Sequence, residues 1–274
     1  MNIGCHVSIA QGIFNAPQRA ADLGAECFQI FTRSPQGGKA PELTEDVLQS
    51  FKIENLKFKI SAFYIHTPYY INFASANNRI RYGSVSVVRD ELERASLLGA
   101  KYVMTHLGSA GELTEPDATE KTSEMLTKTL DGYDGSAELL IENSAGSGKI
   151  IGSTFSQIAE IINQVNHPKL NGICLDTQHS FASGYDWRDF EKTLQQIDSE
   201  IGLDKIKLIH ANDSLTECAS HIDRHAHIGE GFIGAAAFQK IVNFAEEKNI
   251  DMILETEHEK ITADITLLKS FRGK

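Results

Sequence analysis

The sequence predicts an α/β fold in which residues 1–274 form one domain, a (β/α)8 barrel. Eight short apolar runs alternate with segments of helical periodicity along the chain. Six of these runs are followed by a histidine, aspartate or glutamate. The length of 274 residues is close to the ~250 residues typical of such barrels.

The eight expected strands are rich in β-branched, aliphatic and aromatic residues and are bounded by glycine or polar residues. They are Ile3–Ser8, Cys27–Thr32, Ser61–His66, Tyr102–His106, Glu138–Glu142, Gly172–Asp176, Ile206–His210 and Asp251–Glu255. An open doubly wound sheet shows the same alternation. A closed barrel is favoured because all its strands end on one rim, which brings the polar residues at their ends together. We therefore expect a metal site at the C-terminal rim of the strands.

The segments between the strands carry apolar residues three and four positions apart, the spacing of a helix that packs one face on a core. The clearest helices are expected at Val85–Leu98, Phe155–Val165 and Ala235–Phe244. Ser153 or Thr154 is the expected N-cap of the second helix. No linker or low-complexity stretch interrupts the pattern, which again favours a single domain.

Composition restricts the class of protein. Hydrophobic residues make up 41% of the chain, enough for a large core. The apolar runs are far shorter than the ~18 residues of a membrane-spanning helix, and residues 1–15 lack the features of a signal peptide. The four cysteines form no C-x-x-C pair, which is typical of reduced core thiols. We expect a cytoplasmic protein with no membrane segment.

The formal net charge of −11 argues at face value against a nucleic-acid partner, because phosphate contacts require lysine and arginine. Four of the acidic residues, however, are candidate metal ligands. Bound divalent cations would reverse the local sign of the charge. Net charge therefore does not decide the partner.

Nine residues are candidate metal ligands, because imidazole nitrogen and carboxylate oxygen suit Zn²⁺, with Mn²⁺ and Fe²⁺ as competitors. They are His66, His106, Glu142, Asp176, His179, His210, Asp223, His225 and Glu255. A single histidine at a strand end is more often a hydrogen-bonded cap than a ligand. The argument rests on the set, since burying so many ionisable groups at one rim without metal is costly.

Nine ligands exceed what one four- or five-coordinate ion needs. The four carboxylates carry four negative charges, which two divalent ions would neutralise. Three ions would leave a charge of about +2, which balances one phosphodiester and one hydroxide. Glu142, in the middle of the strand order, is placed to bridge ions. The pairs Asp176-x-x-His179 and Asp223-x-His225 lie past strand ends and could share one ion.

Aromatic and basic residues follow several of the same strands. Tyr69 and Tyr70 come shortly after the candidate ligand His66, where they could stack on a base or wedge into a duplex. Basic residues in segments that follow strand ends are candidate phosphate contacts. They are Arg33, Lys39, Arg79, Arg81, Lys149 and Arg224.

The chain resembles the endonuclease IV family of apurinic/apyrimidinic (AP) endonucleases over its length, from Gly4–Ser8 to Leu254–Thr256. The most specific stretches are His66–Asn72, Ile141–Gly146, Cys174–His179 with Ser183–Asp186, and His210–Ser214 leading to Asp223–Gly231. These motifs occur in the family's order, which makes the resemblance strong.

The resemblance implies three zinc ions, because the nine candidates fall on the family's ligand positions. By that analogy one ion is held by His66, His106 and Glu142, a second by Glu142, Asp176, His210 and Glu255, and a third by His179, Asp223 and His225. The implied reaction is hydrolysis of the phosphodiester 5′ to an abasic site in double-stranded DNA, leaving a 3′-hydroxyl and a 5′-deoxyribose phosphate, in base excision repair. Glu142 is the implied catalytic residue, which bridges two ions and holds the attacking water with them.

The loop after the second strand departs from the family, whose members often carry there an arginine and an aromatic residue that invade the DNA. In this chain Gln36 and Gly38 stand at those places within the loop Arg33–Lys39, and Gln36 is a further candidate DNA contact. We expect Tyr69 and Tyr70 to contribute more of the DNA distortion, and DNA affinity to be reduced or differently distributed.

Two other functions compete with this interpretation. A sugar isomerase or epimerase on the same barrel would use one or two ions, so the Asp176–His179 and Asp223–His225 pairs would have no evident role. A non-catalytic, metal-stabilised DNA-binding protein would not require nine ligands. We expect a monomer with no obligate protein partner.

Overall fold

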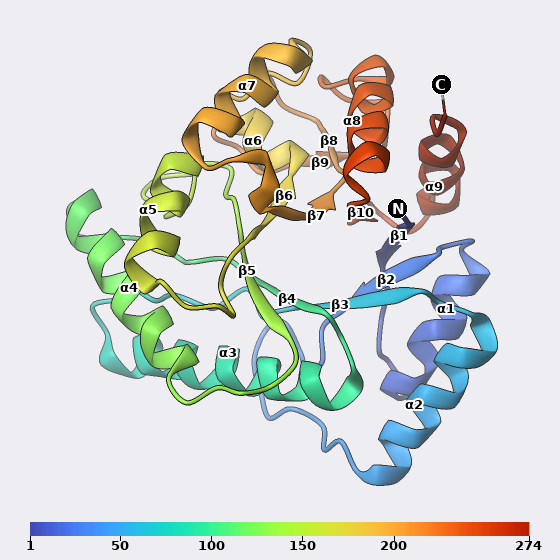
Figure 1. Ribbon diagram of the computed structural model, residues 1–274, viewed down its shortest axis with the longest axis horizontal. Helices are drawn as coiled ribbons and strands as arrows, with labels where there is room; N and C mark the ends of the chain where they lie inside the picture. Colours follow the sequence, from blue (N-terminus) through green and yellow to red (C-terminus); the bar gives the residue numbers. More distant parts are fainter. Residues whose placement is uncertain (274) are drawn as a thin grey trace.

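Eight parallel strands pair side by side and close into a barrel in the order β1-β10-β7-β6-β5-β4-β3-β2 (Figure 1). The computed structural model describes residues 1–273. The barrel strands are β1 (Ile3–His6), β2 (Cys27–Ile30), β3 (Ala62–His66), β4 (Tyr102–Thr105), β5 (Glu138–Glu142), β6 (Ile173–Asp176), β7 (Ile206–His210) and β10 (Asp251–Leu254). The predicted (β/α)8 barrel is confirmed, and each strand lies within two residues of its expected bounds.

Helices connect the strands and surround the barrel (Figure 1). They are α1 (Ala16–Asp22), α2 (Glu45–Phe58), α3 (Asn78–Leu98), α4 (Glu115–Leu130), α5 (Phe155–Val165), α6 (Thr177–Ala182), α7 (Phe190–Glu200), α8 (Ala235–Lys248) and α9 (Ile261–Ser270), with short 3-10 turns η1 (Ile13–Asn15) and η2 (Leu203–Lys205). Between β7 and α8 the chain forms a small antiparallel pair of strands, β8 (Asp213–Ser214) and β9 (His225–Ala226).

Helix α3 is longer than its apolar pattern predicts. It begins at Asn78 rather than Val85. The side chain of Asn77 accepts a hydrogen bond from the backbone N–H of Arg79 at 2.9 Å, which satisfies a donor of the first turn. The first two turns are mostly exposed, so they carry little of the hydrophobic periodicity that marks a helix in sequence.

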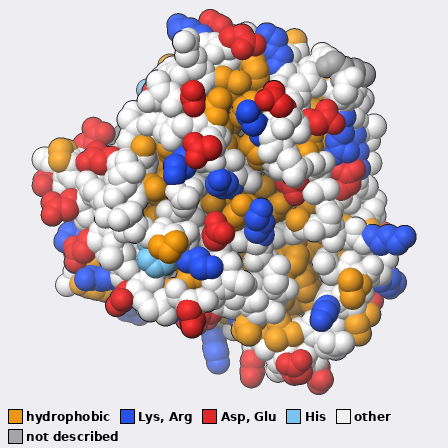
Figure 2. Space-filling model, viewed as in Figure 1, with side chains coloured by type: hydrophobic (Ala, Val, Ile, Leu, Met, Phe, Trp, Pro, Cys, Tyr) orange, Lys and Arg blue, Asp and Glu red, His pale blue; other side chains and the backbone are white. Residues whose placement is uncertain are grey.

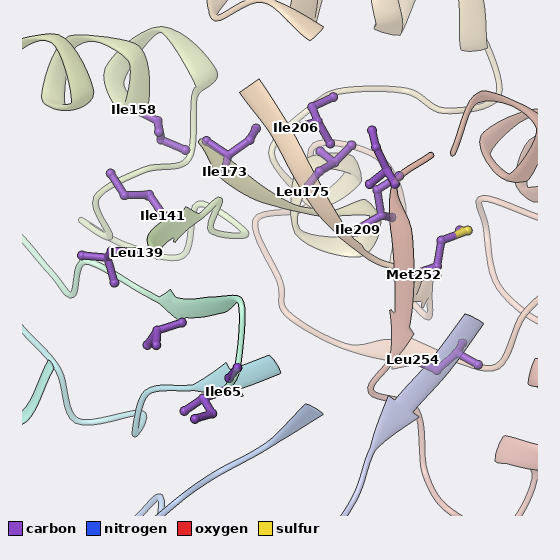
Figure 3. Close-up of a cluster of buried hydrophobic side chains, with 14 of the residues drawn as sticks. Ile65, Leu139, Ile141, Ile158, Ile173, Leu175, Ile206, Ile209, Met252 and Leu254 are labelled. Atoms are coloured by element: carbon purple, nitrogen blue, oxygen red, sulfur yellow. The ribbon is translucent and has the colours of Figure 1, made fainter. Parts of the chain in front are cut away.

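Two apolar cores result from the alternation of side chains along the strands. One lies between the barrel and the helices, and Figure 3 shows part of it, with Ile65 of β3 and Ile141 of β5 in the same cluster as Ile158 of α5. The other takes alternate positions on seven strands: Cys27, Tyr64, Tyr102, Met104, Leu140, Cys174, Leu208 and Ile253. This second set fills the inside of the barrel, which is therefore a packed core and not a pore.

The same alternation builds a polar layer at the C-terminal rim. On β1 the inward position below it is Gly4, where a side chain would collide with the backbone of Cys27. Two residues past the inner apolar layer, every strand reaches a polar side chain. These eight are His6, Gln29, His66, His106, Glu142, Asp176, His210 and Glu255. The fold thus pools one polar residue from each strand.

The outer surface carries mixed charge. On the face shown in Figure 2, lysine and arginine side chains lie among aspartate and glutamate, and no large patch of one sign forms. That face offers no broad basic surface to a polyanion. Within residues 1–273, no helix combines the length and the apolar character needed to cross a membrane.

Candidate metal centre

Glu142 lies at the centre of the rim, and its two carboxylate oxygens face different histidines. Oε2 lies 2.8 Å from Nε2 of His66 and 3.6 Å from Nε2 of His106. Oε1 lies 3.0 Å from Nδ1 of His210 and 3.4 Å from Nδ1 of His179. One carboxylate oxygen therefore faces His66 and His106 and the other faces His210, as a bridging ligand requires.

Eight of the nine candidate ligands form three overlapping groups, in each of which the ligand atoms lie within 4.8 Å of one another. The groups are His66, His106 and Glu142; Glu142, Asp176, His210 and Glu255; and Asp176, His179 and His225. Glu142 belongs to the first two groups and Asp176 to the last two. The shared carboxylates join the three groups into one continuous cluster able to hold metal.

Asp223 completes the cluster on its solvent side. Its Oδ2 lies 3.4 Å from Nε2 of His179, and its Oδ1 lies 3.5 Å from Nε2 of His225. Its side chain is 58% exposed, whereas that of Asp176 is buried. The third group thus has a buried carboxylate, Asp176, beneath the histidines and an exposed one, Asp223, near its opening.

The β8–β9 pair positions the loop that carries Asp223 and His225. The buried carboxylate of Asp213 in β8 accepts backbone N–H bonds from Gly229 and from Ile233, each at 2.9 Å. These bonds tie the chain after β9 back to β8. His225 is consequently presented from a strand rather than from a free loop.

Within residues 1–273, no lysine or arginine forms an ion pair with the carboxylates of the cluster. Glu142 and Asp176 are fully buried, and the ion pairs that they form within residues 1–273 come from histidines. Burial acts to raise the pKa of Glu142, but His106 and His210 hold that pKa well below its usual value. Burial raises the pKa of Asp176 and lowers the pKa of His106 to about 4.

Two buried imidazole nitrogens in the cluster, Nδ1 of His106 and Nε2 of His225, have no hydrogen-bond partner among the described residues. The second lies 3.5 Å from Asp223 Oδ1 and 3.9 Å from Asp176 Oδ2. A buried nitrogen without a hydrogen bond is unfavourable unless it binds an ion. The donor set and its negative charge therefore fit divalent transition-metal ions such as zinc.

Backbone carbonyls orient two of the histidines. His66 Nδ1 donates to the carbonyl oxygen of Thr67 at 2.6 Å. His179 Nδ1 donates to the carbonyl oxygen of Asn143 at 3.0 Å. In each ring the bond leaves Nε2 free to act as a metal ligand, the arrangement in which a hydrogen bond fixes the tautomer of a ligand histidine.

A pocket of ≈ 430 Å³ opens over the cluster. Its lining includes His66, His106, His179, Asp223, His225 and Glu255, with Tyr69, Ile71, Ser144 and Ser147 among the other walls. The volume lies within the ~300–1,000 Å³ of small-molecule sites. The pocket is large enough for a group the size of a nucleotide.

Tyr69 lines this pocket, and Tyr70 is the next residue in the chain. Tyr69 is 67% exposed, and its ring packs edge-on against Phe31 with centroids 5.2 Å apart. Tyr70 is 39% exposed and lies beside Gly37 of the loop after β2. Both side chains are therefore accessible from solvent.

Arg33 is buried, which disfavours a phosphate contact, and that contact stays a prediction. Its guanidinium pairs with Asp90 and Glu91 of α3, and its side chain is 8% exposed. Thr32 Oγ1 donates to the same Glu91 carboxylate at 2.6 Å. The positive charge of Arg33 is therefore balanced inside the protein by two carboxylates.

The other predicted contacts are at the surface. Gln36 and Lys39 are exposed in the loop after β2. Arg224 is exposed between two cluster residues, and its Nη1 donates to the backbone carbonyl of Asp223 at 2.9 Å. Their contact with DNA stays a prediction.

Comparison with known proteins identifies the family of the chain. Residues 17–271 match the family model described as xylose isomerase-like TIM barrel. A Cenarchaeum symbiosum protein named probable endonuclease 4 is 36% identical over 284 residues, which cover 100% of this chain and 99% of that protein. This chain belongs to the endonuclease IV family. The resemblance noted in the sequence is thereby confirmed.

Two further relatives of this endonuclease IV family member support the assignment. A protein of Nitrosopumilus maritimus, also named probable endonuclease 4, is 39% identical over 261 residues and 93% of each chain. The crystal structure of endonuclease IV from Thermus thermophilus superposes with a TM-score of 0.88 at 30% identity, covering 99% of this chain and 98% of that chain. The family likeness thus extends over nearly the whole length.

Four polar residues at the rim escaped the sequence analysis: His6, Gln29, Asn143 and Asn212. Asn212 Nδ2 donates to Asp176 Oδ2 at 2.7 Å. Asn143 directly follows Glu142, and its Oδ1 accepts the backbone N–H of Asp176 at 2.8 Å. Proximity to a ligand could have marked the asparagines. Side chains of a strand alternate between its two faces, so counting every second residue along β1 and β2 would have predicted that His6 and Gln29 face the rim.

Proposed function

We propose that this chain is a metal-dependent AP endonuclease that hydrolyses the phosphodiester 5′ to an abasic site in double-stranded DNA. The products would be a 3′-hydroxyl and a 5′-deoxyribose phosphate, as in base excision repair. The observation that carries the proposal is the set of three overlapping ligand groups beneath one pocket. The names of the relatives, probable endonuclease 4 and endonuclease IV, support the same activity.

The cluster would hold three divalent ions, with zinc the best match to its donors and Mn²⁺ or Fe²⁺ as alternatives at some positions. His66 and His106 would hold the first ion, His210 and Glu255 the second, and Glu142 would bridge them. His179, Asp223 and His225 would hold the third, with Asp176 between the second and third. When bound, such ions lower the pKa of a water molecule and stabilise negative charge on phosphoryl and leaving oxygens.

The protein's own residues fix where this chemistry takes place. Glu142 is the proposed catalytic residue, since its two oxygens, pointing at different imidazoles, set the spacing of the first two ligand groups. His66 and His179, locked by backbone carbonyls, keep Nε2 directed into the cluster. Asp223, at the open side, lies where an incoming phosphate would approach the third group.

The exposed aromatic residues at the pocket edge would recognise the DNA. Tyr69 and Tyr70 are placed to stack on bases beside the abasic gap, a contact that is tolerant of sequence. Gln36, Lys39 and Arg224 are the proposed contacts to the DNA backbone. Without Arg33, the loop after β2 would supply less positive charge than its sequence suggests.

The competing functions fit the site less well. A sugar isomerase or epimerase would need one or two ions, and would leave the third group, built from His179, Asp223 and His225, without a role. A DNA-binding protein that uses metal only for stability would have no need for an open pocket directly above the ligands.

The test is incubation of the zinc-loaded protein with a duplex that carries a single tetrahydrofuran abasic analogue. A nick 5′ to the analogue, with a 3′-hydroxyl that a polymerase can extend, is the expected result. The same duplex without the analogue should stay intact, and EDTA should abolish the nick. Absence of the nick with zinc present would overturn the proposed function.

A further inference from the structure

Two of the eight inward-facing rim positions are occupied by residues outside the ligand set. They are His6 of β1 and Gln29 of β2, which are paired neighbours across the two strands. The other six rim positions carry the metal-ligand candidates. Gln29 is fully buried, so its amide must find all its hydrogen bonds inside the protein. Its partners therefore indicate what this position does.

Both ends of the Gln29 amide are bound to rim residues. Its Oε1 lies 2.7 Å from Nε2 of His210. Its Nε2 donates to Glu255 Oε1 at 2.6 Å and contacts His6 Nδ1 at 3.1 Å. A side-chain amide has two N–H donors and one carbonyl acceptor, and here each is used.

The orientation of this amide is determined by its neighbours. A carboxylate only accepts hydrogen bonds, so the NH₂ end must face Glu255. The carbonyl end then faces His210, whose Nε2 must carry a hydrogen to donate to it. The reverse orientation would place the amide oxygen against the Glu255 carboxylate and is excluded by repulsion.

These bonds select the atoms that face the cluster. Because Nε2 of His210 is bonded to Gln29, Nδ1 is the nitrogen that faces the cluster, 3.0 Å from Glu142 Oε1 and 3.3 Å from Glu255 Oε2. Because Glu255 Oε1 accepts from Gln29, its Oε2 is the oxygen left for the cluster. One amide thus sets the ligand atom of two residues in the same group.

We propose that Gln29 is a positioning residue for the second ion, fixing the tautomer of His210 and the oxygen that Glu255 presents. This inference rests on the proposed three-ion site. His66 and His179 are oriented by backbone carbonyls, which no substitution of those partners removes. His210 instead depends on a side chain for its Nε2 bond.

The test compares Gln29→Met with wild type by elemental analysis after zinc loading and gel filtration, and by competition of bound zinc with a chelator. Methionine keeps the length and shape of glutamine and removes all three contacts. We expect one ion of the set to bind ~10- to 100-fold more weakly, the effect of losing a residue that orients ligands. The remaining ions should bind as in wild type.

The matched control is Gln157→Met. Gln157 of α5 accepts from Gly152 N–H at 2.7 Å and donates to Thr119 at 3.2 Å, away from the cluster. The Gln157→Met variant therefore loses two hydrogen bonds that do not involve the candidate ligands, and its zinc content should equal that of wild type. If Gln29→Met does not fold, Gln29→Asn is the second variant. It keeps the amide but is too short to reach both partners, so it should weaken binding of the same ion.

The outcomes separate this inference from the proposed function. Wild type with fewer than two ions would contradict the multi-ion site itself. Wild type with its full set, together with Gln29→Met or Gln29→Asn binding every ion with unchanged affinity, would overturn the positioning role alone. Equal loss of all ions would also overturn it, because the contacts of Gln29 reach only one ligand group.

Discussion

Two buried acidic clusters of this barrel differ in how their charge is balanced. Beside β2, Glu91 of α3 accepts from Thr32 and pairs with the guanidinium of Arg33. At the rim, Glu142 and Asp176 are equally buried, but their partners within the described chain are imidazoles and amides. In the first cluster, side chains of the protein itself balance the negative charge. The second has carboxylates without fixed cations, which is the electrostatic mark of a metal centre.

The first cluster also has a structural purpose. Arg94 of α3 donates to Thr32 Oγ1 at 2.7 Å and to the carbonyl oxygen of Pro41 at 2.9 Å. It thus holds both ends of the loop after β2 against α3. Buried charge stabilises a loop in one region and remains available for ions in the other, so burial alone does not distinguish the two roles.

The largest effect should follow from Glu142→Gln, which removes the carboxylate shared by two ligand groups. Cleavage of the abasic duplex should fall by at least ~10²-fold, as when a preorganised electrostatic group is lost. Binding of the duplex should persist. Single-turnover cleavage and fluorescence anisotropy measure the two effects. The control is Glu138→Gln, which lies on the same strand but four residues from the rim and should retain activity. A Glu142→Gln variant as active as wild type would contradict the role of Glu142 in the site.

The corresponding change in the first cluster is Glu91→Gln, which should destabilise the protein and leave metal binding unchanged. Among residues 1–273, it leaves the buried Arg33 with Asp90 as its single ionic partner. Breaking a buried ion pair costs about 3–5 kcal/mol, and the remaining pair with Asp90 places this variant near the lower value. Urea denaturation measures the loss, and zinc content should equal that of wild type. Glu93→Gln breaks an exposed pair with Arg89 on the same helix and should cost under ~0.5 kcal/mol. A Glu91→Gln protein that lost zinc at unchanged stability would contradict the separation of the two clusters.

A smaller effect is expected at the pocket edge. Tyr69→Ala should weaken the preference for abasic over intact duplex by about 1–3 kcal/mol if the ring stacks on a base. Tyr69→Phe should keep the preference, because stacking does not need the hydroxyl. Tyr82→Ala, which removes an exposed tyrosine of α3, serves as the matched control. The preference is measured as the ratio of the dissociation constants for intact and abasic duplex. The same ratio in Tyr69→Ala and wild type would argue against the stacking role.

The smallest effect concerns a half-exposed pair remote from the rim. Burial acts against ionisation of Glu26, but Arg272 lowers its pKa from 4.5 to about 2. Because the folded pKa is below the unfolded one, this pair stabilises the protein above about pH 4.5, and the benefit is lost as pH falls through about 2. Glu26→Gln should therefore lower the urea midpoint at pH 7 by an amount equivalent to under ~1 kcal/mol. The difference from wild type should shrink towards pH 2; a difference independent of pH would point to packing instead.

The fold and the gathering of the six strand-end candidate ligands at one rim were predictable because both follow from strand periodicity. A strand that ends at His66 or His210 carries its ligand in the inward phase, two residues after a lumen residue, so local sequence determines the direction of the side chain. The start of α3 at Asn78 was not predictable, since exposed first turns leave no apolar stripe. Its signal was the Asn77 cap.

Other features depend on contacts between distant segments. From the sequence, Arg33 is predicted to be an exposed basic residue of a loop. The packing of α3 is what brings Asp90 and Glu91 against it. Gln29 is not a ligand type, so its bonds to His210 and Glu255, 181 and 226 residues away, were invisible in sequence. The proximity of Asp176 to two ligand groups likewise required the three-dimensional arrangement.

The most direct test of the central claim, that the rim is a multi-ion metal centre, is the number of ions bound per chain. The purified protein would be loaded with Zn²⁺, separated from free metal and analysed by inductively coupled plasma mass spectrometry. The three overlapping ligand groups predict about three zinc ions per chain, lost on treatment with a strong chelator. One ion per chain, or magnesium alone, would contradict the account.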